Sequence, residues 1–128
     1  MRRHFLLSAL PALAVLAVSA PVLAHPKLVS STPAVNSTVS KPKEITLKFS
    51  EKLVPQFSSF ELVMTGMPGM TGHEPMPIKG FTTAVKGDGK TLSASLPRAL
   101  PAGSYELNWH AVAADTHRIQ GKFNFNVK

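Results

Sequence analysis

Four of the chain's five methionines lie in one short segment, and a histidine joins them at the same spacing. Every third position of this segment carries a sulfur or imidazole donor. Thioethers are soft ligands, and among the biological metals they favour Cu(I). The candidate ligands of this methionine segment are Met64, Met67, Met70, His73 and Met76.

A methionine at every third residue is more often the packed face of a helix. Glycines and prolines interrupt each turn here, and no helix tolerates that density of them. They are Gly66, Pro68, Gly69, Gly72, Pro75 and Pro77. The pattern therefore predicts a surface loop or an excursion between strands, where apolar thioethers need a reason to be exposed. A soft-metal site supplies that reason, and an adaptable contact surface is the alternative.

The first 24 residues have the pattern of a secretory signal peptide. A short basic start precedes an almost wholly apolar run over residues 5–20, and small residues precede the expected cut after Ala24. The apolar run is shorter than the roughly 20 residues that a transmembrane helix needs. We therefore expect residues 1–24 to be cleaved and residues 25–128 to form one exported domain that begins at His25.

A second set of candidate ligands offers nitrogen and oxygen donors, which are harder than thioethers. As a first residue, His25 would offer its α-amine and ring Nδ1 to one metal, while Pro26 has no amide hydrogen and excludes backbone-amide coordination there. Asp115 and His117 lie two residues apart, so in an extended segment their side chains would share a face. Together these groups form a nitrogen and oxygen set that suits tetragonal Cu(II). Each element is a weak signal alone, since an Asp-x-His is most often a surface loop.

Composition excludes several functions. The chain has no cysteine, so copper would depend on thioether, imidazole and carboxylate donors. Loss of Arg2 and Arg3 with the leader lowers the net charge from +7 to +5, and the remaining charges are scattered rather than gathered for nucleic acid. No serine–histidine–aspartate set, paired carboxylates or phosphate-binding glycine loop is visible, so we expect no enzymatic activity.

Short stretches of alternating polar and apolar residues run through the rest of the chain. They predict strands around residues 45–49, 60–64, 92–96, 105–110 and 123–127, with weaker candidates at 27–31 and 81–86. Trp109 is expected in the core and His110 on the opposite face of its strand. About seven such strands separated by turn residues predict a single all-β domain, an antiparallel Greek-key β-sandwich or barrel.

These motifs in combination resemble the CopC/PcoC family of periplasmic copper-binding proteins. The resemblance covers the whole mature domain. It rests on His25-Pro-Lys-Leu, Ser31-Thr-Pro, Phe49-Ser-Glu51, the Met-x-x-Met-Pro-Gly-Met segment, and Trp109 followed by Ala114-Asp115-Thr116-His117. It implies a cupredoxin-like (Ig-like) fold with two copper sites at opposite ends, and a periplasmic role in copper resistance or homeostasis.

The resemblance also assigns residues and partners. His25, Asp115 and His117 match the family's Cu(II) ligands, and Glu51 matches an acidic position beside that site. Met64, Met67, Met70, His73 and Met76 match the Cu(I) loop, although not all five are expected to bind at once. A CopD-like inner-membrane copper transporter, a multicopper oxidase, or both, are the implied partners.

Two other functions remain open. An N-terminal histidine with a second histidine is also the ligand pair of copper mono-oxygenases, but Asp115 would fill a position that oxygen activation needs open. The other is a β-sandwich contact module that uses the methionines as its surface.

Overall fold

The computed structural model describes residues 14–15, 17, 25–70 and 74–128. The predicted signal peptide therefore lies almost wholly outside the described residues, and His73 lies outside them too. Within these ranges there is no α-helix, and so none long and apolar enough to cross a membrane.

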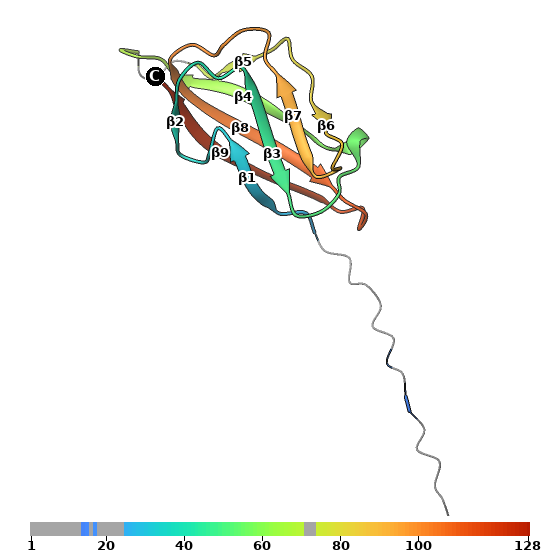
Figure 1. Ribbon diagram of the computed structural model, residues 1–128. Helices are drawn as coiled ribbons and strands as arrows, with labels where there is room; N and C mark the ends of the chain where they lie inside the picture. The colour runs from blue at the N-terminus through green and yellow to red at the C-terminus, as the bar shows by residue number, and fades with distance from the viewer. Residues whose placement is uncertain (1–13, 16, 18–24, 71–73) are drawn as a thin grey trace, which may run out of the picture.

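Two sheets pack face to face, as Figure 1 shows. The four-stranded sheet has the order β1 (Leu28–Thr32), β3 (Glu44–Phe49), β7 (Thr91–Ser95) and β6 (Ala84–Val85). The five-stranded sheet has the order β2 (Thr38–Val39), β9 (Arg118–Val127), β8 (Gly103–Val112), β4 (Ser59–Gly66) and β5 (Met76–Ile78). One 3₁₀ turn, η1 (Pro55–Phe57), precedes β4. The prediction of an all-β Greek-key sandwich is confirmed, with antiparallel pairing throughout except for the parallel pair β2–β9.

The core lies between the sheets and is formed by the alternating apolar residues of the long strands. Ile45 and Leu47 of β3 are fully buried, as are Tyr105 and Leu107 of β8. Tyr105 stacks on Phe125 with ring centroids 5.4 Å apart, and its hydroxyl donates a hydrogen bond of 2.7 Å to the carbonyl oxygen of Pro101. Burial raises the pKa of Tyr105 to about 12, because the phenolate would lose its hydration there.

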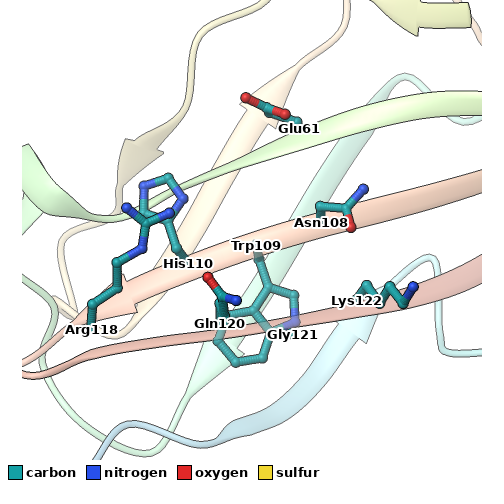
Figure 2. A pocket seen from close by; sticks show the side chains of 8 residues that line it. All are labelled: Glu61, Asn108, Trp109, His110, Arg118, Gln120, Gly121 and Lys122. Carbon is teal, nitrogen blue, oxygen red and sulfur yellow. The ribbon is translucent and has the colours of Figure 1, made fainter.

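Trp109 packs against the core but is only half-buried, so its predicted core position is confirmed in part. Its ring meets Phe49 edge-on at 5.1 Å between centroids. The indole lies over Gly121, its direct partner on β9 (Figure 2). A Cβ at Gly121 would come within 2.5 Å of the indole Cζ2, so the missing side chain makes room for the ring.

Two of the short strands were not predicted from the sequence, and one strand that was predicted is shorter than expected. β2 and β5 were not predicted, and the stretch around residues 81–86 forms a strand only at Ala84–Val85. β5 contains Pro77 and pairs only with β4, which places the proline at the sheet edge, where strands tolerate it. Such short edge strands exist because a longer neighbour pairs with them, and so they carry little periodicity of their own.

The strand register places the two candidate sites at opposite ends of the sandwich. Gly66 pairs with Ser104 at the end where β4 leads into the methionine segment, and Ser59 pairs with His110 near the other end of the same two strands. We call these the methionine end and the histidine end; the latter carries the start of β1 and the β8–β9 connection. In Figure 1 the histidine end is where β1 begins and the arrow of β8 ends.

Candidate metal centre

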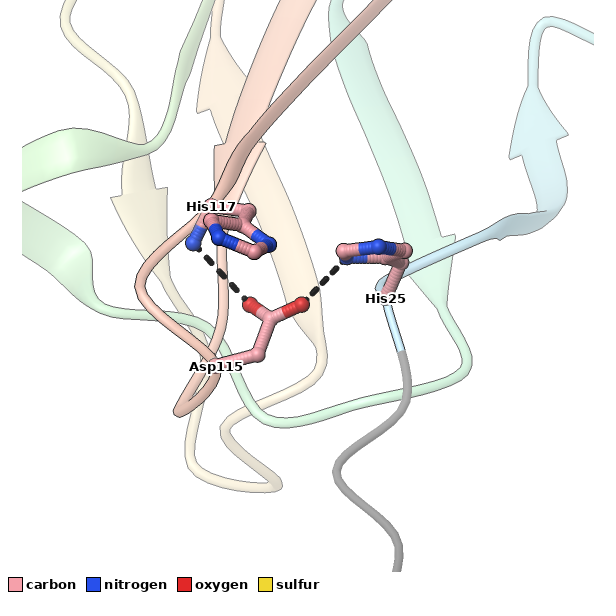
Figure 3. Close-up of side chains that lie close together, drawn as sticks. All are labelled: His25, Asp115 and His117. Atoms are coloured by element: carbon pink, nitrogen blue, oxygen red, sulfur yellow. Dashed lines mark hydrogen bonds and ion pairs between the residues drawn. The ribbon is translucent and has the colours of Figure 1, made fainter.

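His25, Asp115 and His117 come together at the histidine end. One donor atom from each lies within 4.8 Å of the donors of the other two, in the only such cluster of three or more histidine or acidic side chains among the described residues. The two imidazole rings are tilted at 39° with centroids 5.2 Å apart, and the carboxylate lies between them (Figure 3). Two segments separated by most of the chain thus converge on one point.

The Asp115 carboxylate is the buried member of the cluster. Its side chain is 7% exposed, against 55% for His25. Oδ1 accepts a hydrogen bond of 3.2 Å from the backbone N–H of His117, whereas Oδ2 is buried and accepts no hydrogen bond from the described residues. Oδ2 instead forms an ion-pair contact with Nδ1 of His25. A buried carboxylate oxygen that accepts no hydrogen bond and meets only an imidazole nitrogen is a suitable ligand for a cation, since burying a charge with so few partners is costly.

Asp115 and His117 approach each other through a turn and not through an extended segment, so that part of the sequence argument was wrong. Thr116 has a positive φ of 64°, which is uncommon for a β-branched residue. Its N–H donates a 3.0 Å hydrogen bond to the carbonyl oxygen of Ala113. The left-handed residue reverses the chain, and the Asp115 carboxylate can then accept the N–H of His117.

Two other candidates lie outside this cluster. Glu51 is half-buried in the connection after β3, at the same end, and is not a member of the group. His110 is half-buried on β8, as part of a polar hollow with Glu61 and Arg118 (Figure 2). Burial lowers the pKa of His110, and the Arg118 charge lowers it further against the opposing effect of Glu61. This lowered pKa favours the neutral imidazole, and His110 is not a member of the three-residue cluster.

At the methionine end, Met67 and Met70 form a small hairpin. Each backbone N–H donates to the carbonyl oxygen of the other, at 3.5 Å from Met67 and 3.0 Å from Met70. Pro68 and Gly69 make the turn, and the φ of +74° at Gly69 suits glycine in the second central position. Mutually bonded residues of an antiparallel pair point to the same side, so the two thioethers lie on one face. Their side chains are exposed, at 37% and 54%.

The expectation that all four methionines lie at the surface is wrong for Met64. It belongs to β4, is 3% exposed and packs in the hydrophobic core. Met76, its partner on β5, is 45% exposed. The surface thioethers among the described residues are therefore those of Met67, Met70 and Met76.

Sequence reasoning missed what holds these groups in place. The left-handed turn at Thr116 has no signal in the sequence, since threonine is not a residue that favours positive φ. The residues that anchor His25 were also not identified. Only the Pro-Gly pair between Met67 and Met70 carried a readable turn signal.

Comparisons with known proteins place the chain in a family. The sequence model of the CopC domain matches residues 28–128. Copper resistance protein C of Pseudomonas syringae pv. tomato is 51% identical over 111 residues, which cover 87% of this chain and 86% of that protein. Copper resistance protein C of Escherichia coli is 44% identical over 114 residues, which cover 89% of this chain and 90% of that protein.

Comparison with solved structures points to the same family. The crystal structure of PcoC, a methionine-rich copper resistance protein from Escherichia coli, matches with a TM-score of 0.74 and 44% identity, over 82% of this chain and all (100%) of that one. CopC from Methylosinus trichosporium OB3b matches with a TM-score of 0.67 at 24% identity, over 81% of this chain and 94% of that one, which bears on the fold alone. The family model and the identity over most of both chains show that this protein belongs to the CopC domain family.

Proposed function

We propose that this protein is a periplasmic copper carrier in copper resistance, which holds Cu(II) at the histidine end and Cu(I) at the methionine end. The observation that carries the proposal is the convergence of His25, Asp115 and His117 on one point, with a buried carboxylate oxygen that lacks a hydrogen bond. The relatives' name, copper resistance protein C, supports copper as the cargo.

The Cu(II) site would use nitrogen and oxygen only. Cleavage before His25 would add a free α-amine to its ring, and the second imidazole and the carboxylate would complete a tetragonal set. The close approach of the His25, Asp115 and His117 side chains in the uncleaved chain supports this set. Because the imidazoles and the amine must be deprotonated to bind, Cu(II) affinity is expected to fall as the pH drops through the histidine range.

The Cu(I) site would use the exposed thioethers of Met67, Met70 and Met76. The hairpin already places two of them on one face, and Met76 lies at the start of the strand that closes the segment. Thioethers retain the softer oxidation state, so the oxidation state of the ion would decide which end is filled.

A carrier fits this arrangement better than an enzyme. Two sites at opposite ends would let the protein take copper in either oxidation state and release it by ligand exchange. A CopD-like inner-membrane copper transporter, a multicopper oxidase, or both, are the partners we propose. A mono-oxygenase is less favoured, because Asp115 as a ligand would fill a position that oxygen activation needs open.

Copper stoichiometry in each oxidation state tests the proposal. Exported protein whose N-terminus has been verified by intact mass should bind one Cu(II) with a type 2 electron paramagnetic resonance signal, and one Cu(I) with sulfur scattering in X-ray absorption. His117→Ala should lose the first and keep the second. Equal Cu(II) binding by His117→Ala would overturn the assignment, as would a single copper that moves between oxidation states without changing its ligands.

A further inference from the structure

Two hydrogen bonds tie the backbone just after His25 to the connection that follows β3. The N–H of Lys27 donates to the Oγ of Ser50 at 3.0 Å. The N–H of Ser50 donates in return to the carbonyl oxygen of Lys27 at 2.9 Å. The next pair in the ladder is Leu28 with Phe49, so the Ser50 hydroxyl extends the β1–β3 pairing by one residue toward the N-terminus.

Pro26 fixes the single residue that remains between this contact and His25. Its ring is fully buried, although its neighbours His25 and Lys27 are exposed. Proline can be buried here at little cost because it has no N–H to satisfy. Its φ is locked near −65°, and a residue before proline is restricted to extended conformations. Little freedom is left between the Lys27 N–H and the backbone nitrogen of His25.

We propose that Ser50 and Pro26 form a clamp that holds the new N-terminus over Asp115 and His117, and that this clamp sets the affinity for Cu(II). This inference rests on the proposed Cu(II) site. Ser50 is a positioning residue, since it binds the backbone of Lys27 and does not belong to the ligand cluster.

The need for such a clamp follows from where His25 lies in the chain. The first residues of a domain are poorly ordered unless something ties them down, and cleavage would leave His25 at the chain end. A ligand that is already ordered before the metal arrives loses less conformational entropy on binding. The Asp115–His117 turn is fixed by its own hydrogen bonds, so the N-terminal side of the site depends on the clamp.

Ser50→Ala in the mature protein removes the hydroxyl that accepts the Lys27 N–H. We expect its Cu(II) dissociation constant to rise roughly three- to tenfold, the value of one net hydrogen bond. Ser50→Thr keeps a hydroxyl and should restore most of the affinity. Ser104→Ala is the matched control, because its hydroxyl donates to Asn126 at 2.8 Å at the methionine end, and it should leave Cu(II) affinity unchanged. Cu(I) affinity should be equal in all four proteins.

Hydrogen exchange in the metal-free protein supplies a readout that does not depend on copper. The Lys27 amide should exchange faster in Ser50→Ala and at the wild-type rate in Ser104→Ala. If the Lys27 amide loses protection but Cu(II) binds with wild-type affinity, the clamp has no part in binding and the inference is overturned. Unchanged Lys27 protection in Ser50→Ala overturns it as well. A wild-type protein that binds no Cu(II) would instead overturn the proposed site itself, and the clamp's role with it.

Discussion

Met64 and Met76 are direct partners across the β4–β5 pair, yet one is a core residue and the other a surface residue. Met64 is 3% exposed and Met76 is 45% exposed. β4 is covered by strands on both sides, whereas β5 is the edge strand. The Met64 methyl group also lies 3.2 Å from the position that a Cβ on Gly103 would take, which shows how tightly it is enclosed.

This difference predicts that the methionines are not equivalent toward Cu(I). Met64→Leu conserves volume in the core, so it should cost less than about 1.5 kcal/mol of stability and leave Cu(I) binding intact. Changing Met67, Met70 and Met76 together to leucine should abolish Cu(I) binding with the fold retained. Sulfur scattering in X-ray absorption and circular dichroism measure the two effects. If Met64→Leu alone stays folded but no longer binds Cu(I), the distinction between the buried methionine and the exposed ones is contradicted.

The turn at Thr116 predicts opposite results for two substitutions. Glycine adopts positive φ freely, so Thr116→Gly should retain Cu(II) affinity and change stability by no more than about 1 kcal/mol. Proline cannot adopt the observed φ of 64° and would lose the N–H bonded to Ala113, so Thr116→Pro should lose Cu(II) binding. Isothermal titration measures both, with Cu(I) binding as the control. A large loss of affinity in Thr116→Gly would mean that the threonine side chain matters and the turn does not.

The contact between Trp109 and Gly121 predicts strong sensitivity to one added methyl group. Gly121→Ala would place its Cβ within 2.5 Å of the indole and should cost about 1–3 kcal/mol of unfolding free energy. Gly87→Ala is the matched control, because nothing lies within 4 Å of its Cβ position and its stability should hardly change. Urea unfolding followed by the fluorescence of the single tryptophan measures the difference. Equal midpoints for the two variants would show that the indole moves aside freely.

The buried hydroxyl of Tyr105 predicts a loss of stability at alkaline pH. Its pKa is raised to about 12 in the folded protein, while the unfolded chain ionises near the ordinary value of about 10. Between these values the unfolded state loses a proton that the folded state keeps, so the unfolding free energy falls as the pH rises. Tyr105→Phe should lack this contribution and lose about 1 kcal/mol at neutral pH with the hydrogen bond to Pro101.

Urea unfolding of wild type and Tyr105→Phe is measured across this pH range. The difference between the two unfolding free energies separates the contribution of Tyr105 from that of the lysines. Phenolate absorbance reports the titration directly, because this is the chain's only tyrosine. Ionisation at the ordinary value in the folded protein would contradict the assignment.

The sequence by itself determined the class of fold and the kinds of donor atom. Alternating residues such as Tyr105 and Leu107 predict half-buried strands, because successive side chains of a strand point to opposite faces of the sheet. The glycines and prolines around Met67 and Met70 excluded a helix for equally local reasons and predicted a loop or an excursion between strands.

Only the tertiary structure decided which donors meet and which are exposed. Regular spacing made Met64 and Met70 look alike, but burial depends on neighbouring strands that are distant in the sequence. The approach of His25 to Asp115 joins opposite ends of the chain, and the hold of Ser50 on Lys27 bridges 23 residues. Such contacts depend on how the strands pair and how the two sheets pack. Local periodicity carries no information about which residues far apart in the sequence come close together in space.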